Sequence, residues 1–112
     1  MVRNFKFYLD DITESISIIH KYLEGKTEEQ LFADQFLQDA LFRRLEIIGE
    51  ASRQLPDWIK QQHPEVPWKD IINMRNVFVH EYFGIDLDLV WRQLHQDLTQ
   101  LKQQIDDIVN SL

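Results

Sequence analysis

The apolar residues of this chain recur at the spacing of one side of a helix. In its last third they alternate steps of four and three residues, at Leu87, Trp91, Leu94, Leu98, Leu101, Ile105, Ile108 and Leu112. The same alternation occurs near the beginning, at Phe5, Leu9, Ile12, Ile16, Ile19 and Leu23. A helix with this repeat buries one seam, either in the core of its own chain or against a partner chain. Because such seams are more often core, we predict a bundle of packed helices.

Capping and breaking residues divide the first half of the chain into further helices. Gly25 ends the first helix, and Thr27 with Gln30 resembles a capping box that opens a short helix toward Ala33. Asp34 can cap a longer helix that runs to about Leu55. The predicted inner side of that helix consists of Leu37, Leu41, Leu45, Ile48, Ala51 and Leu55. Pro56 follows and ends it.

The second half contains a short helix and two long ones. A helical turn from Trp58 to Gln62 ends at His63, because a residue before proline is disfavoured in the helical region. Pro67 suits a first helical position, so the next helix is predicted from Trp68 to about Tyr82. Gly84 ends that helix, and Asp86 caps the last one. We therefore predict an all-α, up-and-down bundle of four main helices plus short ones, forming a single domain over residues 1–112.

Composition excludes several classes of protein. The chain has 112 residues, 44% hydrophobic and 28% charged, and contains no cysteine, so disulfides and thiolate metal sites are excluded. No apolar run approaches the roughly 20 residues of a membrane span. The start, MVRNFKFYLDD, turns acidic before the apolar region of a secretory signal could form. We expect a soluble cytoplasmic domain. The net charge of −7 disfavours non-specific binding to nucleic acid.

Charge is unevenly distributed along the chain. Residues 43–80 contain six lysines and arginines against five acidic residues, and the remainder contains six against fourteen. An anionic ligand could therefore approach the middle of the chain. Within this region Glu46 and Glu50 stand four residues apart, a repulsive spacing on a helix unless a cation lies between them. We expect these carboxylates to orient an arginine, namely Arg43, Arg53 or Arg75.

Polar residues interrupt the hydrophobic helix before Gly84. In MRNVFVHEYFGID, Asn76 and His80 are four residues apart and share a helix face, while Arg75 and Tyr82 are seven apart and share another. An arginine offers planar donors to a phosphate, and a histidine gives and takes protons near neutral pH. These are the groups needed to cleave an RNA phosphodiester without a metal: a base, a cation at phosphorus and an acid. One chain offers one such histidine, so a symmetric dimer would supply the second.

The same residues also allow a purely structural interpretation. Arg75 would then be an ion-paired interface residue, His80 a hydrogen-bonded buried residue, and Tyr82 a packing aromatic. The other histidines, His20, His63 and His95, are expected to be solvated or structural. Because no HxxxH or carboxylate–histidine spacing suggests a metal site, we expect no metal and no cofactor. The spacing of arginine and histidine alone does not decide between these interpretations.

Three stretches of the sequence resemble the HepT-like branch of the HEPN superfamily. They are IIGEA at Ile47–Ala51, the PW pair at Pro67–Trp68, and RNVFVHEY at Arg75–Tyr82. The resemblance extends from about Phe5 through the last helix, which is nearly the whole chain. Together these three stretches indicate this family far more specifically than the arginine–histidine spacing alone does.

The resemblance implies a small helical bundle that forms a homodimer, with R-x4-H helices lining a cleft at the interface. Family members are ribonucleases, often toxins of toxin–antitoxin pairs. By resemblance, Arg75 and His80 match the catalytic pair, and Asn76 matches the polar residue usual after the arginine. The family's partner is an MntA-like minimal nucleotidyltransferase, which neutralises the toxin by transferring AMP to the tyrosine two residues past the histidine. That position is Tyr82 in this chain.

These implications lead to one expected function and leave two alternatives. The expected function is a metal-independent endoribonuclease that acts on RNA as a homodimer and is regulated by AMP transfer. The first alternative is a non-catalytic HEPN dimer that serves as a binding or substrate-presenting subunit for the nucleotidyltransferase. The second is a helical scaffold dimer without chemistry.

Overall fold

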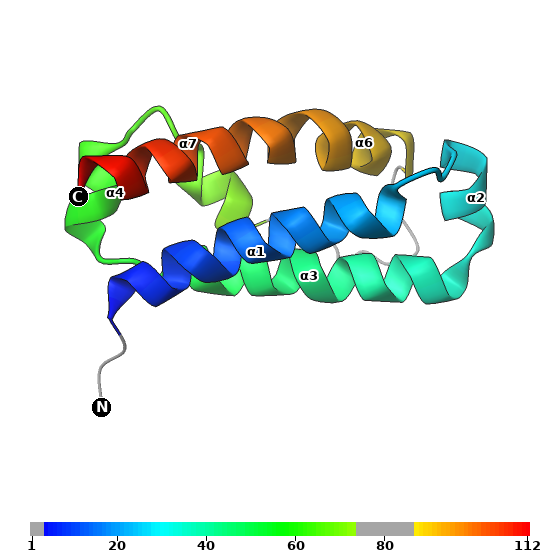
Figure 1. Cartoon of the computed structure of the whole chain (residues 1–112), viewed down its shortest axis with the longest axis horizontal. Helices are drawn as coiled ribbons and strands as arrows, with labels where there is room; N and C mark the ends of the chain where they lie inside the picture. Colours follow the sequence, from blue (N-terminus) through cyan, green and yellow to red (C-terminus); the bar gives the residue numbers. More distant parts are fainter. Residues whose placement is uncertain (1–3, 74–86) are drawn as a thin grey trace.

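Three long helical segments lie side by side in the computed structural model, which describes residues 4–73 and 87–112. They are α1 (Phe5–Leu23), α3 (Gln35–Gln54) and the segment formed by α6 (Leu87–Arg92) and α7 (Leu98–Ser111). Helix α1 packs against both α3 and α7 (Figure 1). The short helices α2 (Glu28–Ala33) and α4 (Asp57–Gln62) lie at opposite ends of the bundle. Every regular element of the described residues is helical, which confirms the predicted all-α bundle.

Local sequence sets the boundaries of the first three helices. Gly25 has φ +72°, a conformation that L-residues rarely adopt, and it follows the end of α1. Thr27 and Gln30 form the expected capping box: the Thr27 N–H donates to Gln30 Oε1 at 2.8 Å, and the Gln30 N–H donates to Thr27 Oγ1 at 3.2 Å. The Leu37 N–H donates to Asp34 Oδ1 at 3.0 Å, so Asp34 caps α3 as predicted.

The predicted seams form the core. All six residues assigned to the inner side of α3 are buried, and Leu9, Ile12, Ile16 and Ile19 of α1 are fully buried. On the last segment the buried residues include Leu94, Leu98, Leu101, Ile105 and Ile108. Leu112 was expected to continue this seam but is 52% exposed, because α7 ends at Ser111 and leaves the last residue beyond the bundle. The two heptad seams therefore face inward within one chain.

The last segment is not the uninterrupted α-helix that the seam predicts. A π-helical turn, Gln93–Asp97, separates α6 from α7, and the Leu98 N–H donates to the Gln93 carbonyl five residues back. Val90, Leu94 and Leu98 are all buried although they are spaced by four and four. In a regular α-helix two steps of four would rotate the side chain by about 80° relative to the starting direction. The wider turn reduces this rotation and keeps all three residues on the core side.

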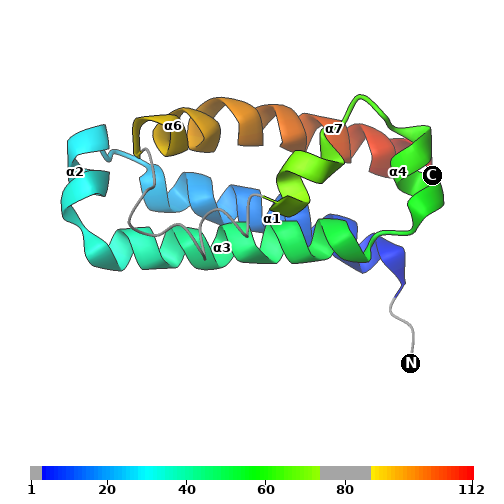
Figure 2. The ribbon, with the colours of Figure 1, turned by 180° about the vertical axis from the view of Figure 1, so that it is seen from behind.

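A further helix begins at Trp68 and is described as far as Asn73. Figure 2 shows it on the face of the bundle opposite the one seen in Figure 1. Val66, Trp68 and Ile71 are buried in the common core, so they attach this helix to the bundle. The Pro67 carbonyl accepts the Ile71 N–H at 3.0 Å, so Pro67 stands just before the helix and not at its first position.

Candidate functional site

The four residues singled out from the sequence, Arg75, Asn76, His80 and Tyr82, lie outside the described residues. Their predicted roles therefore remain predictions. The structure does describe the helix that leads into this segment from Trp68 and the helix α6 that follows it from Leu87. These two helices flank the four predicted residues in the sequence.

The first turn of the leading helix is held by Trp68. Its indole Nε1–H donates to the His63 carbonyl at 3.0 Å, and its backbone N–H donates to the Val66 carbonyl at 2.8 Å. The Trp68 side chain is otherwise buried in the core. These contacts join the loop that contains Pro64 and Pro67 to the start of the helix. The PW pair therefore has a clear structural role: it anchors the first turn of this helix to the core.

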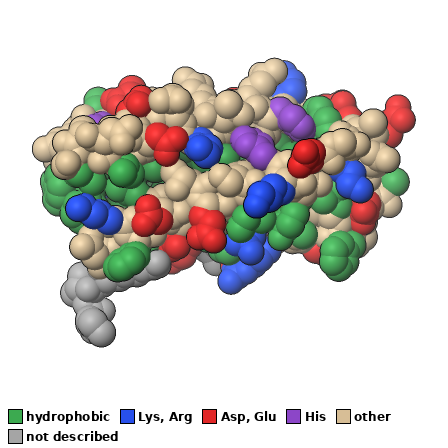
Figure 3. Space-filling view, in the orientation of Figure 1, with side chains coloured by type: hydrophobic (Ala, Val, Ile, Leu, Met, Phe, Trp, Pro, Cys, Tyr) green, Lys and Arg blue, Asp and Glu red, His purple; other side chains and the backbone are tan. Residues whose placement is uncertain are grey.

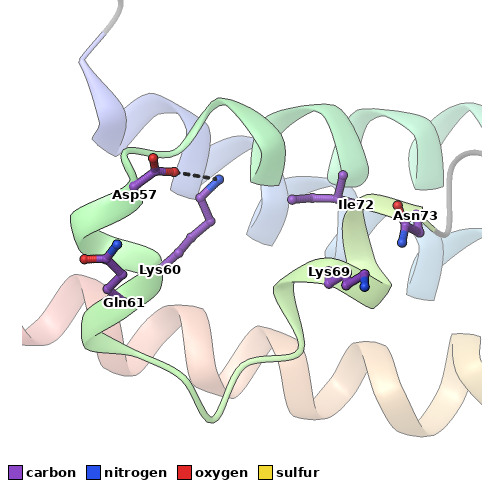
Figure 4. A pocket seen from close by; sticks show the side chains of 6 residues that line it. All are labelled: Asp57, Lys60, Gln61, Lys69, Ile72 and Asn73. Atoms are coloured by element: carbon purple, nitrogen blue, oxygen red, sulfur yellow. Dashed lines mark ion pairs between the residues drawn. The ribbon is translucent and has the colours of Figure 1, made fainter.

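A hollow of about 400 Å³ opens between α4 and this leading helix. Figure 4 shows its six lining side chains, which are Asp57, Lys60, Gln61, Lys69, Ile72 and Asn73. The size is in the range of small-ligand sites. Four of the six side chains can donate hydrogen bonds, and a fifth, Asp57, is a carboxylate. The hollow therefore offers donors for an anionic group, and it lies beside residues that immediately precede Arg75 in the sequence.

The ammonium of Lys60 lies within this hollow's lining. Its Nζ donates to the Arg53 carbonyl at 3.4 Å and lies 3.8 Å from Asp57 Oδ1. The Lys60 side chain is only 18% exposed, while that of Asp57 is 90% exposed. The ion pair between Lys60 and Asp57 is thus long, and its carboxylate faces solvent. Such ion pairs contribute little to stability.

A second hollow lies along α1 and α3 and is lined by the charged side of α3. Arg43 donates to Glu46 Oε1 at 2.8 Å, and Arg53 donates to Glu50 Oε1 at 2.7 Å. These carboxylates therefore orient Arg43 and Arg53, two of the three arginines expected from the sequence. On the face shown in Figure 3, acidic and basic side chains are interspersed over the surface. These two exposed ion pairs offset part of the like-charge repulsion between Glu46 and Glu50.

The other histidines have structural contacts, as predicted. His20 Nε2 lies 3.3 Å from the Leu94 carbonyl, and His95 Nδ1 lies 2.9 Å from the Trp91 carbonyl. His63 Nδ1 lies 3.4 Å from Glu65. Within residues 4–73 and 87–112, no group of three or more histidine or acidic side chains is arranged to hold a metal ion. In those same ranges, no helix has the length and hydrophobicity that a membrane crossing requires.

Sequence reasoning missed the paired lysines of the first hollow. Lys60 and Lys69 are nine residues apart, and no helical or strand spacing relates them. Both line the hollow because the loop after α4 brings the helix from Trp68 alongside α4 (Figure 4). The only available signal was the cluster of prolines between them, which indicates a turn but not its direction.

Comparison with known proteins places the chain in a family. The family model described as "Ribonuclease HepT-like" matches residues 12–108. The chain is 42% identical, over its full length, to a Methanocaldococcus jannaschii protein named "Gamma-glutamylcyclotransferase and putative RNase", and it spans half of that protein. It is 38% identical over 96% of its length to "Probable ribonuclease HepT" of Thermococcus cleftensis, of which it covers 98%.

A third relative, from Caldanaerobacter subterraneus and named as an RNase, is 34% identical over 91% of each chain. No solved structure matches this one significantly. The family match covers both flanks of the candidate site, from the core of α1 through α7. With the all-α bundle, these similarities establish that the chain belongs to the HepT-like ribonuclease family.

Proposed function

We propose that this chain is a metal-independent endoribonuclease that acts as the toxin of a toxin–antitoxin pair in the cytoplasm. The observation that carries the proposal is the family match over residues 12–108, a range that includes Arg75 and His80 at the R-x4-H spacing. Relatives named as ribonucleases support RNA as the substrate. The family relationship thus favours the catalytic interpretation of the polar cluster over the structural one.

The proposed reaction needs no group beyond the protein and the RNA. A neutral His80 removes the proton from a ribose 2′-hydroxyl, and the resulting oxygen attacks the adjacent phosphorus. The bond from phosphorus to the 5′-oxygen breaks, and a protonated histidine gives its proton to that oxygen. The products are a 2′,3′-cyclic phosphate and a 5′-hydroxyl. Arg75 stabilises the negative charge that builds on the phosphate oxygens, and Asn76 orients the phosphate.

Two proton transfers require two histidines, and each chain supplies one at this motif. We therefore propose a homodimer in which both copies of His80 face one phosphate, one as base and one as acid. The dimer also supplies a second Arg75. In this arrangement neither protomer is an independent enzyme.

Regulation is proposed to occur at Tyr82, through AMP transfer by an MntA-like nucleotidyltransferase. The added nucleotide carries a negative phosphate and a bulky base, and it would stand two residues from His80. Such a group would occupy the cations of the cleft and exclude RNA from it, by the same electrostatics that govern phosphorylation switches. Antitoxin action is thus explained without unfolding the toxin.

The test is cleavage of RNA by the purified protein in EDTA. Wild-type protein should produce fragments that end in 2′,3′-cyclic phosphate, and His80→Ala and Arg75→Ala should each reduce the rate by at least about a hundredfold. His95→Ala is the matched control, since it removes an exposed histidine from the same bundle, and it should cleave at the wild-type rate. Equal cleavage by all four proteins would identify a contaminating nuclease. Absence of cleavage, with a stable complex between this chain and the nucleotidyltransferase, would favour the non-catalytic subunit instead.

A further inference from the structure

A lysine-lined hollow adjoins the helix from Trp68, whose described part ends at Asn73, two residues before Arg75 in the sequence. Its cations are Lys60 of α4 and Lys69 of the helix from Trp68, and its single anion is Asp57. The hollow thus has one more positive than negative side chain in a protein whose net charge is −7. For an anionic ligand, a local excess of positive charge on an acidic protein marks a preferred point of approach.

The contacts of Lys60 leave donors for a ligand. Its ammonium has three N–H groups, and one of them donates to the Arg53 carbonyl. Asp57 Oδ1, at 3.8 Å, is within ion-pair range but beyond hydrogen-bond distance. Because the Asp57 side chain is 90% exposed, it can turn toward solvent when an anion enters. The Lys60 stem is largely buried, so its charge is held in place without the entropy cost of ordering a free lysine.

Lys69 completes the opposite wall. It is exposed, and among the described residues no carboxylate lies within ion-pair distance of it. The amide side chains of Gln61 and Asn73 line the same hollow, and Ile72 adds a half-buried apolar surface. Figure 4 shows these side chains spread along the hollow, with the tip of Lys60 directed toward Asp57. The lining thus offers ammonium, amide and apolar groups, which are the kinds of group that contact the backbone of an extended nucleic-acid strand.

Chain connectivity relates this hollow to the chemistry. Asn73 belongs to the lining and precedes Arg75 by two residues. An RNA strand whose scissile phosphate is bound at Arg75 extends past that point in both directions and carries a phosphate at every nucleotide. A neighbouring phosphate needs cations, because single-stranded RNA binds mainly through neutralised phosphates.

We propose that the hollow lined by Lys60, Lys69, Gln61 and Asn73 is a phosphate-binding subsite for the RNA strand beside the scissile phosphate. The proposal rests on the proposed ribonuclease function and extends it to a part of the protein outside the R-x4-H motif. The subsite holds the strand equally in the ground state and the transition state, so it affects KM and not kcat. It is a positioning element for substrate and takes no part in proton transfer.

The experiment compares Lys69→Gln, Lys60→Gln and Lys60→Arg with the control Lys26→Gln. Lys26 is an exposed lysine after α1, at the end of the bundle away from α4, so its replacement makes the same change in net charge (Figure 1). Lys60→Arg keeps the positive charge. Circular dichroism and sedimentation test whether each variant keeps its fold and assembly. Lys69 has no described structural contact, so Lys69→Gln remains informative if Lys60→Gln fails to fold.

Two measurements separate this proposal from the function on which it rests. The first is the KM and kcat for cleavage of single-stranded RNA: Lys69→Gln and Lys60→Gln should raise KM roughly three- to tenfold with kcat unchanged, and Lys60→Arg should restore KM. The second is binding of a fully 2′-O-methylated single-stranded RNA, which cannot be cleaved, as a function of salt. Each glutamine variant should reduce the slope of log affinity against log salt by about 0.7, and Lys26→Gln should not.

Three outcomes would contradict the proposed subsite, the proposed ribonuclease function, or both. If wild-type protein cleaves RNA while Lys69→Gln and Lys26→Gln share its KM and salt slope, the subsite is wrong and the ribonuclease function stands. If wild-type protein neither cleaves nor binds the RNA probes, the proposed function fails and takes the subsite with it. If the probe binds with a Lys69-dependent salt slope but no RNA is cleaved, the subsite stands as an RNA-binding site and the catalytic function fails.

Discussion

The indole N–H of Trp68 donates to the carbonyl of His63 at 3.0 Å, across the loop that precedes the helix from Trp68. This bond is made by a largely buried side chain, and it joins the end of α4 to the beginning of the next helix. The position of the lysine-lined hollow depends on the same loop, because Lys60 lies before it and Lys69 after it. One tryptophan therefore stabilises the core and sets the geometry of a candidate RNA-binding surface.

Trp68→Phe should destabilise the protein by about 1–3 kcal/mol, because it removes the indole donor and leaves the His63 carbonyl without it. The free energy of unfolding in urea measures this change. Trp58→Phe is the matched control: Trp58 is 47% exposed and contacts Phe5 edge to face at 5.5 Å. Trp58→Phe should lower the free energy of unfolding by less than about 1 kcal/mol. Equal losses for the two variants would show that the Trp68 bond does not anchor the loop.

His20→Ala should destabilise the bundle by about 1 kcal/mol. In a regular α-helix the Leu94 carbonyl would accept the Leu98 N–H, but this N–H donates to Gln93 in the π-helical turn. His20 Nε2 is 3.3 Å from the Leu94 carbonyl and serves as its donor from α1. His95→Ala is the comparison, since the His95 contact is to Trp91 within its own segment. Urea unfolding should show the larger loss for His20→Ala, and a reversed order would contradict this role for His20.

Mixed dimers test whether two copies of His80 share one catalytic site. Wild-type protein and His80→Ala are mixed in varying proportions and allowed to exchange subunits. If both histidines are required, activity should fall as the square of the wild-type fraction, because only wild-type homodimers cleave RNA. A linear fall would mean that each protomer acts alone. Dilution of wild-type protein with Lys26→Gln should leave activity constant.

Tyr82→Phe tests the proposed modification site. The chain is incubated with the purified nucleotidyltransferase and ATP, and its intact mass is measured. Wild-type protein should gain the mass of one or more AMP groups and lose ribonuclease activity, since the added phosphate competes for the cations of the cleft. Tyr82→Phe should gain no mass and remain active. Tyr22→Phe removes an exposed tyrosine on α1 and should be modified like the wild type. Mass gain by Tyr82→Phe would place the acceptor elsewhere.

Local signals in the sequence predicted most helix boundaries. The capping box of Thr27 and Gln30, the cap at Asp34 and the turn at Gly25 each depend on residues within a few positions of one another. The inner side of α3 followed from spacing alone, because burial of an amphipathic helix selects the apolar stripe whatever the neighbouring helix is. The functional residues Arg75, Asn76, His80 and Tyr82 came from the motif and the family resemblance, and they remain proposals.

The amino-acid sequence by itself determined that this chain forms amphipathic helices, where most of them begin and end, and which faces are buried. Those properties arise from contacts between residues close together in the chain. Only the tertiary structure decided that the last helix widens at Gln93–Asp97 and that Lys60 and Lys69 line one hollow. At the first, the Leu94 carbonyl lies 3.3 Å from Nε2 of His20, 74 residues earlier in the chain, and the second depends on the direction in which a loop returns across the bundle. Periodicity cannot encode such long-range contacts, because it records only which side of a helix is apolar.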